Sequence, residues 1–444
     1  MRHRNGRALY LHWTAKLRET EHRAKPRVPP RAAIHTFFLC ALVTLLFAAS
    51  VPAQTKNGCL DCHSQLDAPF HVDPAEYARS IHTQKGIACA NCHGGDPTTD
   101  DMSKAMSPEA GFKGHPDRKQ VPTFCARCHA DAAYIRGFNP SLRTDQYAQY
   151  LTSVHGKLLS KGNDKVAVCI DCHGVHDILP PNDPHSRVYP TNVAHTCGSC
   201  HANADYMKPF KIPTNQLALY GTSVHHEALV DRGDLSAPTC STCHGSHGAA
   251  PPGVSSVANV CSTCHVVQAE LFDSSPHKDV FNTLGLPGCV TCHSNHGILH
   301  PTDAFLGTEY GAVCLKCHSA GESGYEAAGK MHAQLVRLDA SIARSKIILN
   351  TAEQAGVEVG QAQLELDEAR DDLTKARVTI HGIDIAKVDE NVEAGLKVTD
   401  AAYRAGQSAM GEAVYRRRGL GLALVFILAT VVGLYLFIRQ IERT

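Results

Sequence analysis

The chain has little of the material from which a conventional soluble core is built. It contains one tryptophan, and the aromatic residues together make up 6% of its 444 positions. Leucine, isoleucine and valine are not dense through the middle of the chain, so side chains alone would bury too little apolar surface there. We therefore expect something other than side chains to fill the interior of that region.

An excess of charge of either sign is also missing. The chain has 43 basic and 43 acidic side chains, so its formal net charge is zero. This balance does not indicate a nucleic acid or another polyanion as partner. Cysteine and histidine are instead unusually frequent, with 19 and 28 residues.

The N-terminal residues have the features of an export signal. Lysine and arginine are frequent in 1–35, an apolar run follows at 36–50, and small residues come next at 51–53. The run is short for a membrane span of ~20 residues, so we interpret 1–53 as a cleaved signal peptide. The alternative is an N-terminal membrane anchor.

A second apolar stretch, at 419–438, contains no charged residue. Its length and composition predict one membrane-spanning helix. Three arginines at 416–418 would lie outside if the chain is exported, which the positive-inside rule slightly disfavours. The export signal and the motifs described next outweigh this small imbalance.

The motif Cys-x-x-Cys-His occurs nine times and includes every cysteine except Cys40, which lies in the signal segment. Two thiols at this spacing can add to the two vinyl groups of one haem, and the adjacent histidine becomes the proximal iron ligand. Zinc sites and disulfides would not require a histidine after every second cysteine. We expect nine covalently attached haem c groups. The attachment cysteines are Cys59, Cys62, Cys89, Cys92, Cys125, Cys128, Cys169, Cys172, Cys197, Cys200, Cys240, Cys243, Cys261, Cys264, Cys289, Cys292, Cys314 and Cys317, and the proximal histidines are His63, His93, His129, His173, His201, His244, His265, His293 and His318.

Eight of the motifs belong to four repeated units, at 77–129, 150–201, 220–265 and 271–318. Each unit has a Ser-x-His element, then a first motif, then a second motif. The motif at 59–63 precedes the units. Such an internal period indicates one supersecondary unit that recurs along the chain.

Histidines at the repeated positions outside the motifs are predicted to be second axial ligands of iron. The Ser-x-His elements supply His82, His155, His225 and His277, and His332 in "GKMH" is the same element after the last unit. The third position after a first motif supplies His176, His247 and His296, where the first unit has Asp96. His71 and His115 compete for the remaining place.

His176 lies only three residues after the proximal His173. It would have to cross the porphyrin to reach the opposite face of the same iron, so we expect it to bind a neighbouring haem. Ligation by methionine should be rare, because few methionines remain after processing. The other histidines, His381 among them, are not expected to be ligands.

These motifs resemble those of the periplasmic multihaem c-type cytochromes. Long helices after the last motif are a feature that hydroxylamine oxidoreductases and cytochrome c nitrite reductases share. The resemblance implies closely stacked haems, mostly with two histidine ligands, that form an electron wire. The chain departs from the catalytic members, because all nine motifs end in histidine and no tyrosine stands in a recognisable cross-linking context.

After the last motif cysteine disappears, and proline is absent from about 325 to 415. We predict two or three long helices here, the last of which continues into the membrane span. The apolar residues expected near one face of 360–380 are Leu364, Leu366, Ala369, Leu373 and Ala376, with Asp371 and Lys375 as an i,i+4 ion pair. Breaks are expected at Gly356, Gly360 and Gly382.

The sequence thus predicts a mostly α-helical chain with much irregular structure. Its expected parts are a signal peptide at 1–53, a nonahaem domain at 54–320, a helical, coiled-coil-like region at 321–418, a transmembrane helix at 419–438 and a short tail at 439–444. The helical region is expected to be a packing layer and stalk. The alternative is an interface, either with further copies of the chain or with a membrane partner.

The expected function is electron transfer on the periplasmic side of the inner membrane. Electrons would pass from a membrane donor, such as a quinol-oxidising cytochrome b, to a periplasmic or outer-membrane acceptor, with no catalytic residue required. One alternative is an oxidoreductase for a small nitrogen or sulfur compound, which needs a haem with an open position. Another is a haem sensor that signals through the helical region.

Overall fold

Helices and irregular segments account for residues 57–251 and 253–443, the part of the chain that the computed structural model describes, and no β-strand occurs among them. The mostly helical class predicted from the sequence is confirmed. The predicted signal peptide lies outside the described residues.

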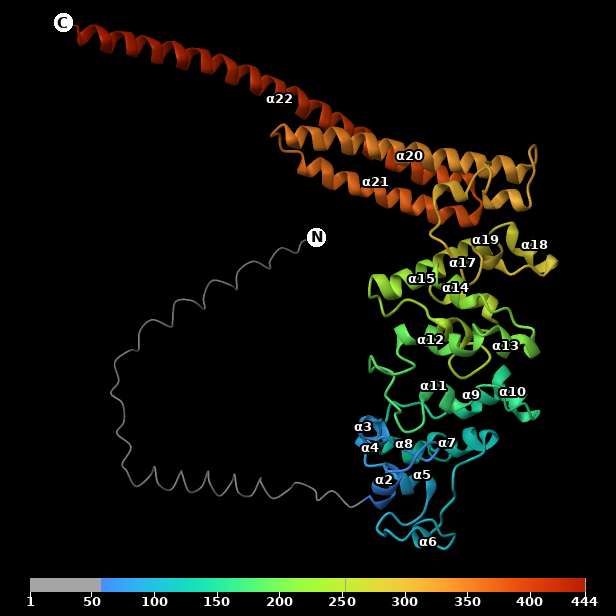
Figure 1. Cartoon of the computed structure of the whole chain (residues 1–444). Helices are drawn as coiled ribbons and strands as arrows, with labels where there is room; N and C mark the ends of the chain where they lie inside the picture. The colour runs from blue at the N-terminus through green and yellow to red at the C-terminus, as the bar shows by residue number, and fades with distance from the viewer. Residues whose placement is uncertain (1–56, 252, 444) are drawn as a thin grey trace, which may run out of the picture.

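The first part of the chain forms a column of short helices that runs broadly in chain order, from α2, α5 and α6 at one end to α18 and α19 at the other (Figure 1). Its elements are α2 (Gly58–His63), α3 (Pro74–Arg79), α4 (Ile81–Gln84), α5 (Cys89–His93), α6 (Met102–Ala105), η1 (Arg118–Gln120), α7 (Val121–His129), α8 (Ala132–Arg136), α9 (Gln146–Thr152), α10 (Val154–Ser160), α11 (Cys169–His173), α12 (Pro190–His201), α13 (Ala204–Met207), η2 (Lys208–Phe210), α14 (Gln216–Gly221), α15 (Val224–His226), η3 (Glu227–Asp231), α16 (Cys240–His244), η4 (Val257–Thr263), α17 (Val266–Asp273), α18 (His277–Leu284), α19 (Gly288–His293), η5 (Asp303–Phe305) and η6 (Val313–Lys316).

The serine of each Ser-x-His element is buried at the point where a helix begins. Ser153 and Ser223 cap helices α10 and α15, accepting hydrogen bonds from the backbone N–H groups of Gly156 (3.0 Å) and His226 (3.2 Å). Their hydroxyls also donate to backbone carbonyls three residues earlier. Because a serine side chain satisfies an otherwise unpaired N–H group at a helix start, the serine fixes the first turn that presents the histidine.

Little apolar packing is found inside the column. A cluster of four buried residues comprises Val121, Leu159, Val166 and Val168. By contrast, the largest cluster lies among the three long helices that cross the far end of the column (Figure 1). This distribution matches the expectation that side chains alone do not fill the motif-bearing region.

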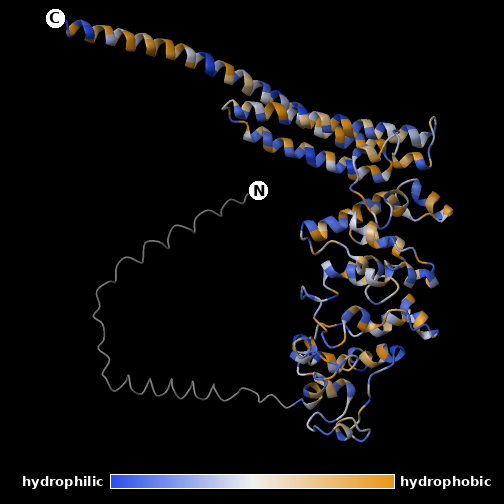
Figure 2. Ribbon diagram, viewed as in Figure 1, coloured by the Kyte–Doolittle hydropathy of each residue, from blue (hydrophilic) through white to orange (hydrophobic). Residues whose placement is uncertain are grey.

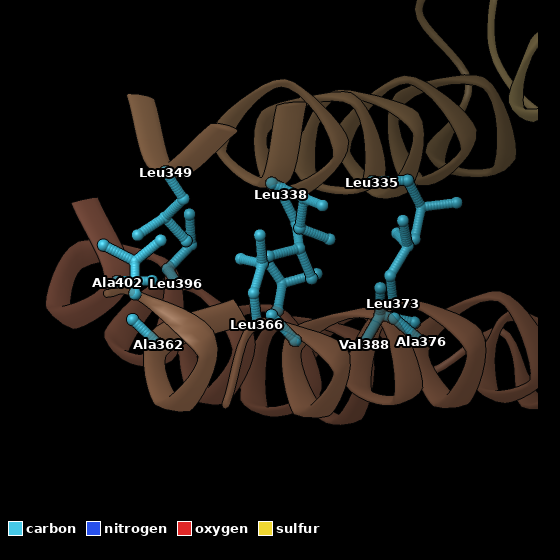
Figure 3. Packing of buried hydrophobic residues seen from close by; sticks show 14 of the residues in the cluster. Leu335, Leu338, Leu349, Ala362, Leu366, Leu373, Ala376, Val388, Leu396 and Ala402 are labelled. Carbon is cyan, nitrogen blue, oxygen red and sulfur yellow. The ribbon is translucent and has the colours of Figure 1, made fainter. Parts of the chain in front are cut away.

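The long helices are α20 (Ser323–Gln354), α21 (Gly360–Thr379) and α22 (Ile385–Ile441), with the short turn η7 (Ile380–Gly382) between the last two. Leucine side chains of α20 face small and branched residues of α21 and α22 (Figure 3). The breaks fall at the predicted glycines, and Gly356 takes a left-handed φ of 84° between α20 and α21.

Two details of the predicted α21 surface are wrong. Leu364 is 65% exposed, and Ala362 is buried instead. At 3.6 residues per turn, Leu364 and the buried Leu366 point about 160° apart, so they cannot share a face. Lys375 pairs with Asp372 at 2.8 Å instead of with Asp371.

The last helix continues without a break from the bundle through the apolar stretch at 419–438. This end of α22 projects away from the rest of the chain and is strongly hydrophobic (Figure 2). Among the described helices α22 alone is long and apolar enough to cross a membrane, and its most apolar window is 0% buried. An apolar surface of this extent, left uncovered by protein, suits a lipid environment.

Leu338 of α20 is 0% exposed, so its truncation should weaken the helical bundle. We expect Leu338→Ala to lower the free energy of unfolding of this region by about 2–5 kcal/mol, because a cavity replaces buried methyl groups. Denaturant titration followed by far-ultraviolet circular dichroism measures the change. The matched control is Ile347→Ala on the same helix, where the side chain is 67% exposed and the effect should stay within about 0.5 kcal/mol. Equal losses in both variants would contradict this packing.

Candidate haem-attachment sites

The motif residues share one face of a single helical turn. Helices α5, α11 and α16 begin at the first cysteine of a motif and end at its histidine. Residues three and four positions apart are neighbours on a helix surface, so this turn presents two thiols and one imidazole together. Second motifs occupy the ends of longer helices, as in α7 and α12.

The two motif types differ in the residue that follows the histidine. After the first motifs it has a left-handed backbone, with φ between 66° and 82° at Gly94, Gly174, Gly245 and Ser294. After the second motifs at α7 and α12 the backbone stays right-handed. The left-handed turn ends the helix abruptly and directs the following residues away from their own motif.

Eight of the nine motif histidines face one histidine from elsewhere in the chain. The pairs and their ring-centroid separations are His93–His176 (6.4 Å), His129–His82 (5.9 Å), His173–His247 (6.1 Å), His201–His155 (6.2 Å), His244–His296 (5.9 Å), His265–His225 (6.3 Å), His293–His381 (6.1 Å) and His318–His277 (6.0 Å).

These separations fit two imidazoles on opposite sides of one iron. Metal–nitrogen bonds of about 2 Å and about 1.2 Å from nitrogen to ring centre give about 6.4 Å between centroids. Direct aromatic contacts range over about 4.5–7 Å, so one distance alone would not decide. The narrow spread over eight pairs, each with one motif histidine, favours a shared metal.

The pairing follows a simple register. Each second motif faces the Ser-x-His histidine of its own unit, as His129 faces His82. In the first three units the first motif faces the histidine that follows the next unit's first motif: His93 faces His176, His173 faces His247 and His244 faces His296. His176 therefore lies beside the motif of another unit and not opposite His173.

This register accounts for Asp96. A histidine at that position would face the first motif of a preceding unit, and the described residues contain no such preceding unit. The first motif of the first unit still has a facing histidine, because the ring of His176 faces that of His93.

His381 faces the motif at 289–293, which is the first motif of the fourth unit. His381 was not expected to be a ligand, and His332, which was, does not face this motif. The ring of His381 lies 6.1 Å from that of His293, and its Nδ1 donates to the carbonyl of Val378 at 2.8 Å. His332 lies in the first third of α20 and packs beside Gly307. The "GKMH" element lacks the serine that begins a helix in the four units, which explains why the analogy with His332 fails in the structure.

A continuous cavity of about 3010 Å³ runs through the column and is lined by residues of all nine motifs. Small-molecule sites usually occupy about 300–1,000 Å³, so this volume suits several large groups. His381, His71 and His115 line the cavity, and His332 does not. Thus the donor set, the facing rings and the cavity all fit a series of haems.

His63 has no facing histidine among the described residues. Its Nδ1 lies 2.9 Å from the carbonyl of Phe70, and its own carbonyl accepts from the N–H of Val72. His71 is exposed within this same short loop, where its Nδ1 lies 3.1 Å from the carbonyl of Leu66. His115 is also exposed, and neither ring pairs with His63.

The motifs are neighbours in the order of the sequence. At every junction a cysteine of one motif interacts with a cysteine of the next: Cys59 with Cys89, Cys92 with Cys128, Cys125 with Cys169, Cys172 with Cys200, Cys197 with Cys240, Cys243 with Cys264, Cys261 with Cys289, and Cys292 with Cys314. The attachment sites therefore form one unbranched series from the first motif to the ninth.

Comparison with known proteins agrees with this arrangement. A family model described as the doubled CXXCH motif matches residues 285–323, which contain the last pair of motifs. The chain is a multihaem c-type cytochrome. It is similar to the C-type polyheme cytochrome OmcC of Geobacter sulfurreducens, with 24% identity over 214 residues that cover 42% of this chain and 26% of that protein. The match thus spans about a quarter of the relative's length. No solved structure matches the chain.

Several axial histidine candidates of this cytochrome are held neutral by burial. Burial and the neighbouring His247 lower the pKa of His173 to about 4, and burial likewise lowers the pKa of His155 and His244. Only a neutral imidazole has a lone pair for iron. For His93 a hydrogen bond from Nδ1 to the carbonyl of Gly114, at 2.8 Å, orients the ring and leaves Nε2 for the metal.

Side chains also fasten neighbouring motifs of the cytochrome to one another. Arg118, just before α7, forms two hydrogen bonds with Asp171 of the α11 motif and a third, at 2.9 Å, with the carbonyl of Val166. Arg127 donates to the carbonyl of Cys92 at 2.8 Å. Bidentate arginine–carboxylate contacts are geometrically specific, so they fix the separation between successive sites. Sequence reasoning missed both arginines, because nothing in the motifs indicates these partners.

Proposed function

We propose that this protein is a nine-haem electron carrier fastened to a membrane by the end of α22. The observation that supports the proposal most strongly is the unbranched order of the attachment sites, each next to the following one. Haem iron supplies reversible one-electron transfer, and the chain's contribution is to hold each site in place between two neighbours.

The orientation of the column supports a direction for this carrier. The ninth motif lies beside the long helices, where Cys314 packs against the bundle core. The first motif lies at the opposite end of the column (Figure 1). If α22 crosses the inner membrane and the column is periplasmic, the ninth site faces a membrane donor such as a quinol-oxidising protein. The first site then faces a periplasmic or outer-membrane acceptor.

The ends of the series are also the more accessible attachment sites. Cys62 in the first motif and Cys317 in the ninth are exposed, as is Cys264 in the seventh. The cysteines of the other motifs are partly buried. An exposed cysteine at each end of the series suits a carrier that exchanges electrons with protein partners there.

A redox assay on the purified full-length protein tests this function. We expect every haem to be reduced by a chemical donor and reoxidised by a soluble ferric cytochrome, followed by visible absorbance in stopped flow. We expect no sustained consumption of nitrite, hydroxylamine or sulfite when a donor is supplied in excess. Continuous turnover of one of these compounds would contradict a pure carrier and favour the oxidoreductase alternative. A large fraction of haem that never reoxidises would contradict the unbroken series.

A further inference from the structure

The first motif is built like the second motif of an incomplete unit. Its Cys59 interacts electrostatically with Cys89 of the next motif, and first cysteines also interact between Cys125 and Cys169. The residue after His63 is Ser64 with a right-handed φ of −73°, as at second motifs. By this register, the histidine that faces His63 should come from a Ser-x-His element of the same unit, upstream of the motif.

That upstream element is missing from the described chain. In the four complete units the Ser-x-His histidine precedes its second-motif partner by 40 to 47 residues, from the difference between 225 and 265 and that between 82 and 129. The corresponding positions before His63 fall at 16–23, where His22 occurs without a serine two residues before it, and they lie inside the predicted signal peptide, which would be removed. Asp96 is not a substitute, because its position corresponds to a partner of first motifs.

The two nearby cavity histidines do not reproduce the facing arrangement. The loop after the motif returns to His63, where Val72 donates to the His63 carbonyl at 3.1 Å, and the Nδ1 of His71 lies 3.1 Å from the carbonyl of Leu66 in this loop. His115 follows Gly114, whose carbonyl accepts from the ring of the neighbouring proximal His93. Both rings are exposed, and neither faces His63.

We propose that His63 is the sole protein ligand of its iron and that the opposite face binds small exogenous iron ligands such as carbon monoxide. Access is available at this end of the column, because the cavity-lining side chains Phe70 and Met102 are 60% and 68% exposed. The motif cysteine Cys62 is exposed too. Five-coordinate haem iron is the form that takes up diatomic ligands, whereas two histidines block both faces. This inference rests on the nine-haem assignment above.

The test is titration of the dithionite-reduced full-length protein with carbon monoxide, with electron paramagnetic resonance of the oxidised form. We expect one carbon monoxide bound per chain and one high-spin ferric haem among low-spin ones. His82→Ala should raise the bound carbon monoxide from one to two per chain, which shows that the assay counts open positions. A wild-type protein that is entirely low-spin and binds no carbon monoxide overturns the proposal.

The double variant Cys59→Ala/Cys62→Ala locates the site. It should lose one haem, the high-spin signal and all carbon monoxide binding. If binding persists in this variant, the open position belongs to another haem and the proposal is wrong. It is equally wrong if the wild type binds none and His71→Ala or His115→Ala gains binding, since that histidine would then be the missing ligand.

The same preparations separate this proposal from the carrier function. Nine haems that all cycle but never bind carbon monoxide leave the carrier intact and refute the open site. Carbon monoxide binding together with steady nitrite or hydroxylamine turnover keeps the open site and refutes the pure carrier.

Discussion

Replacing His176 with alanine is expected to turn one low-spin haem of this cytochrome high-spin, while the number of attached haems stays the same. The ring of His176 faces His93 at 6.4 Å, and attachment at that site depends on Cys89 and Cys92 and not on the distal ring. Removing one axial imidazole leaves a five-coordinate iron with a weaker ligand field. Electron paramagnetic resonance gives the spin state, and the haem-to-protein ratio gives the count.

The matched control for this change is His195→Ala. His195 is exposed on α12 and does not line the cavity, so its loss should leave the spectrum unaltered. A spectrum of His176→Ala that matches the wild type would show that His176 is not an iron ligand. A high-spin haem at the motif of Cys169 and Cys172, instead of at that of Cys89 and Cys92, would show that His176 binds the iron of its own motif.

His381→Ala is expected to produce the same spectral change at the site of His293, and His332→Ala is expected to produce none. His381 faces His293 at 6.1 Å and lines the cavity, whereas His332 lies within α20 beside Gly307. Reduced His381→Ala protein should bind one more carbon monoxide per chain than the wild type. The two variants therefore decide between the register seen in the structure and the analogy of sequence position.

The reverse outcome has a clear meaning. If His332→Ala becomes high-spin and His381→Ala does not, then α20 must rotate so that the His332 side chain enters the cavity. That movement would expose Met331 and Leu335, which are 2% and 1% exposed in the bundle. Burial of two such side chains stabilises the bundle by about 3–6 kcal/mol, so we expect the reverse outcome not to occur.

The sequence predicts the attachment residues because their chemistry is local. Five consecutive residues contain both thiols and the proximal imidazole, and one helical turn brings them together. The repeat also predicts most of the facing histidines, since the same position recurs in each unit. Their partners could not be read in the same way, because His176 and His93 are joined by contacts between units and not by nearness in the chain.

His381 shows where sequence analogy stops. It belongs to no unit, and its position is set by the turn η7 between α21 and α22, whose neighbour in space is α17 of the column. Only the packing of the helical bundle against the column brings that turn to His293. The helical region thus brings a candidate axial histidine to His293, which composition and periodicity do not indicate.

The haem content of the purified full-length protein tests the central claim most directly. Pyridine haemochrome absorbance measures haem, amino-acid analysis measures polypeptide, and acidified acetone extraction shows whether the haem is covalently attached. We predict nine non-extractable haems per chain, one for each Cys-x-x-Cys-His motif. A ratio clearly below nine, or haem that the solvent removes, would contradict the account of an unbroken series of sites from His63 to His318.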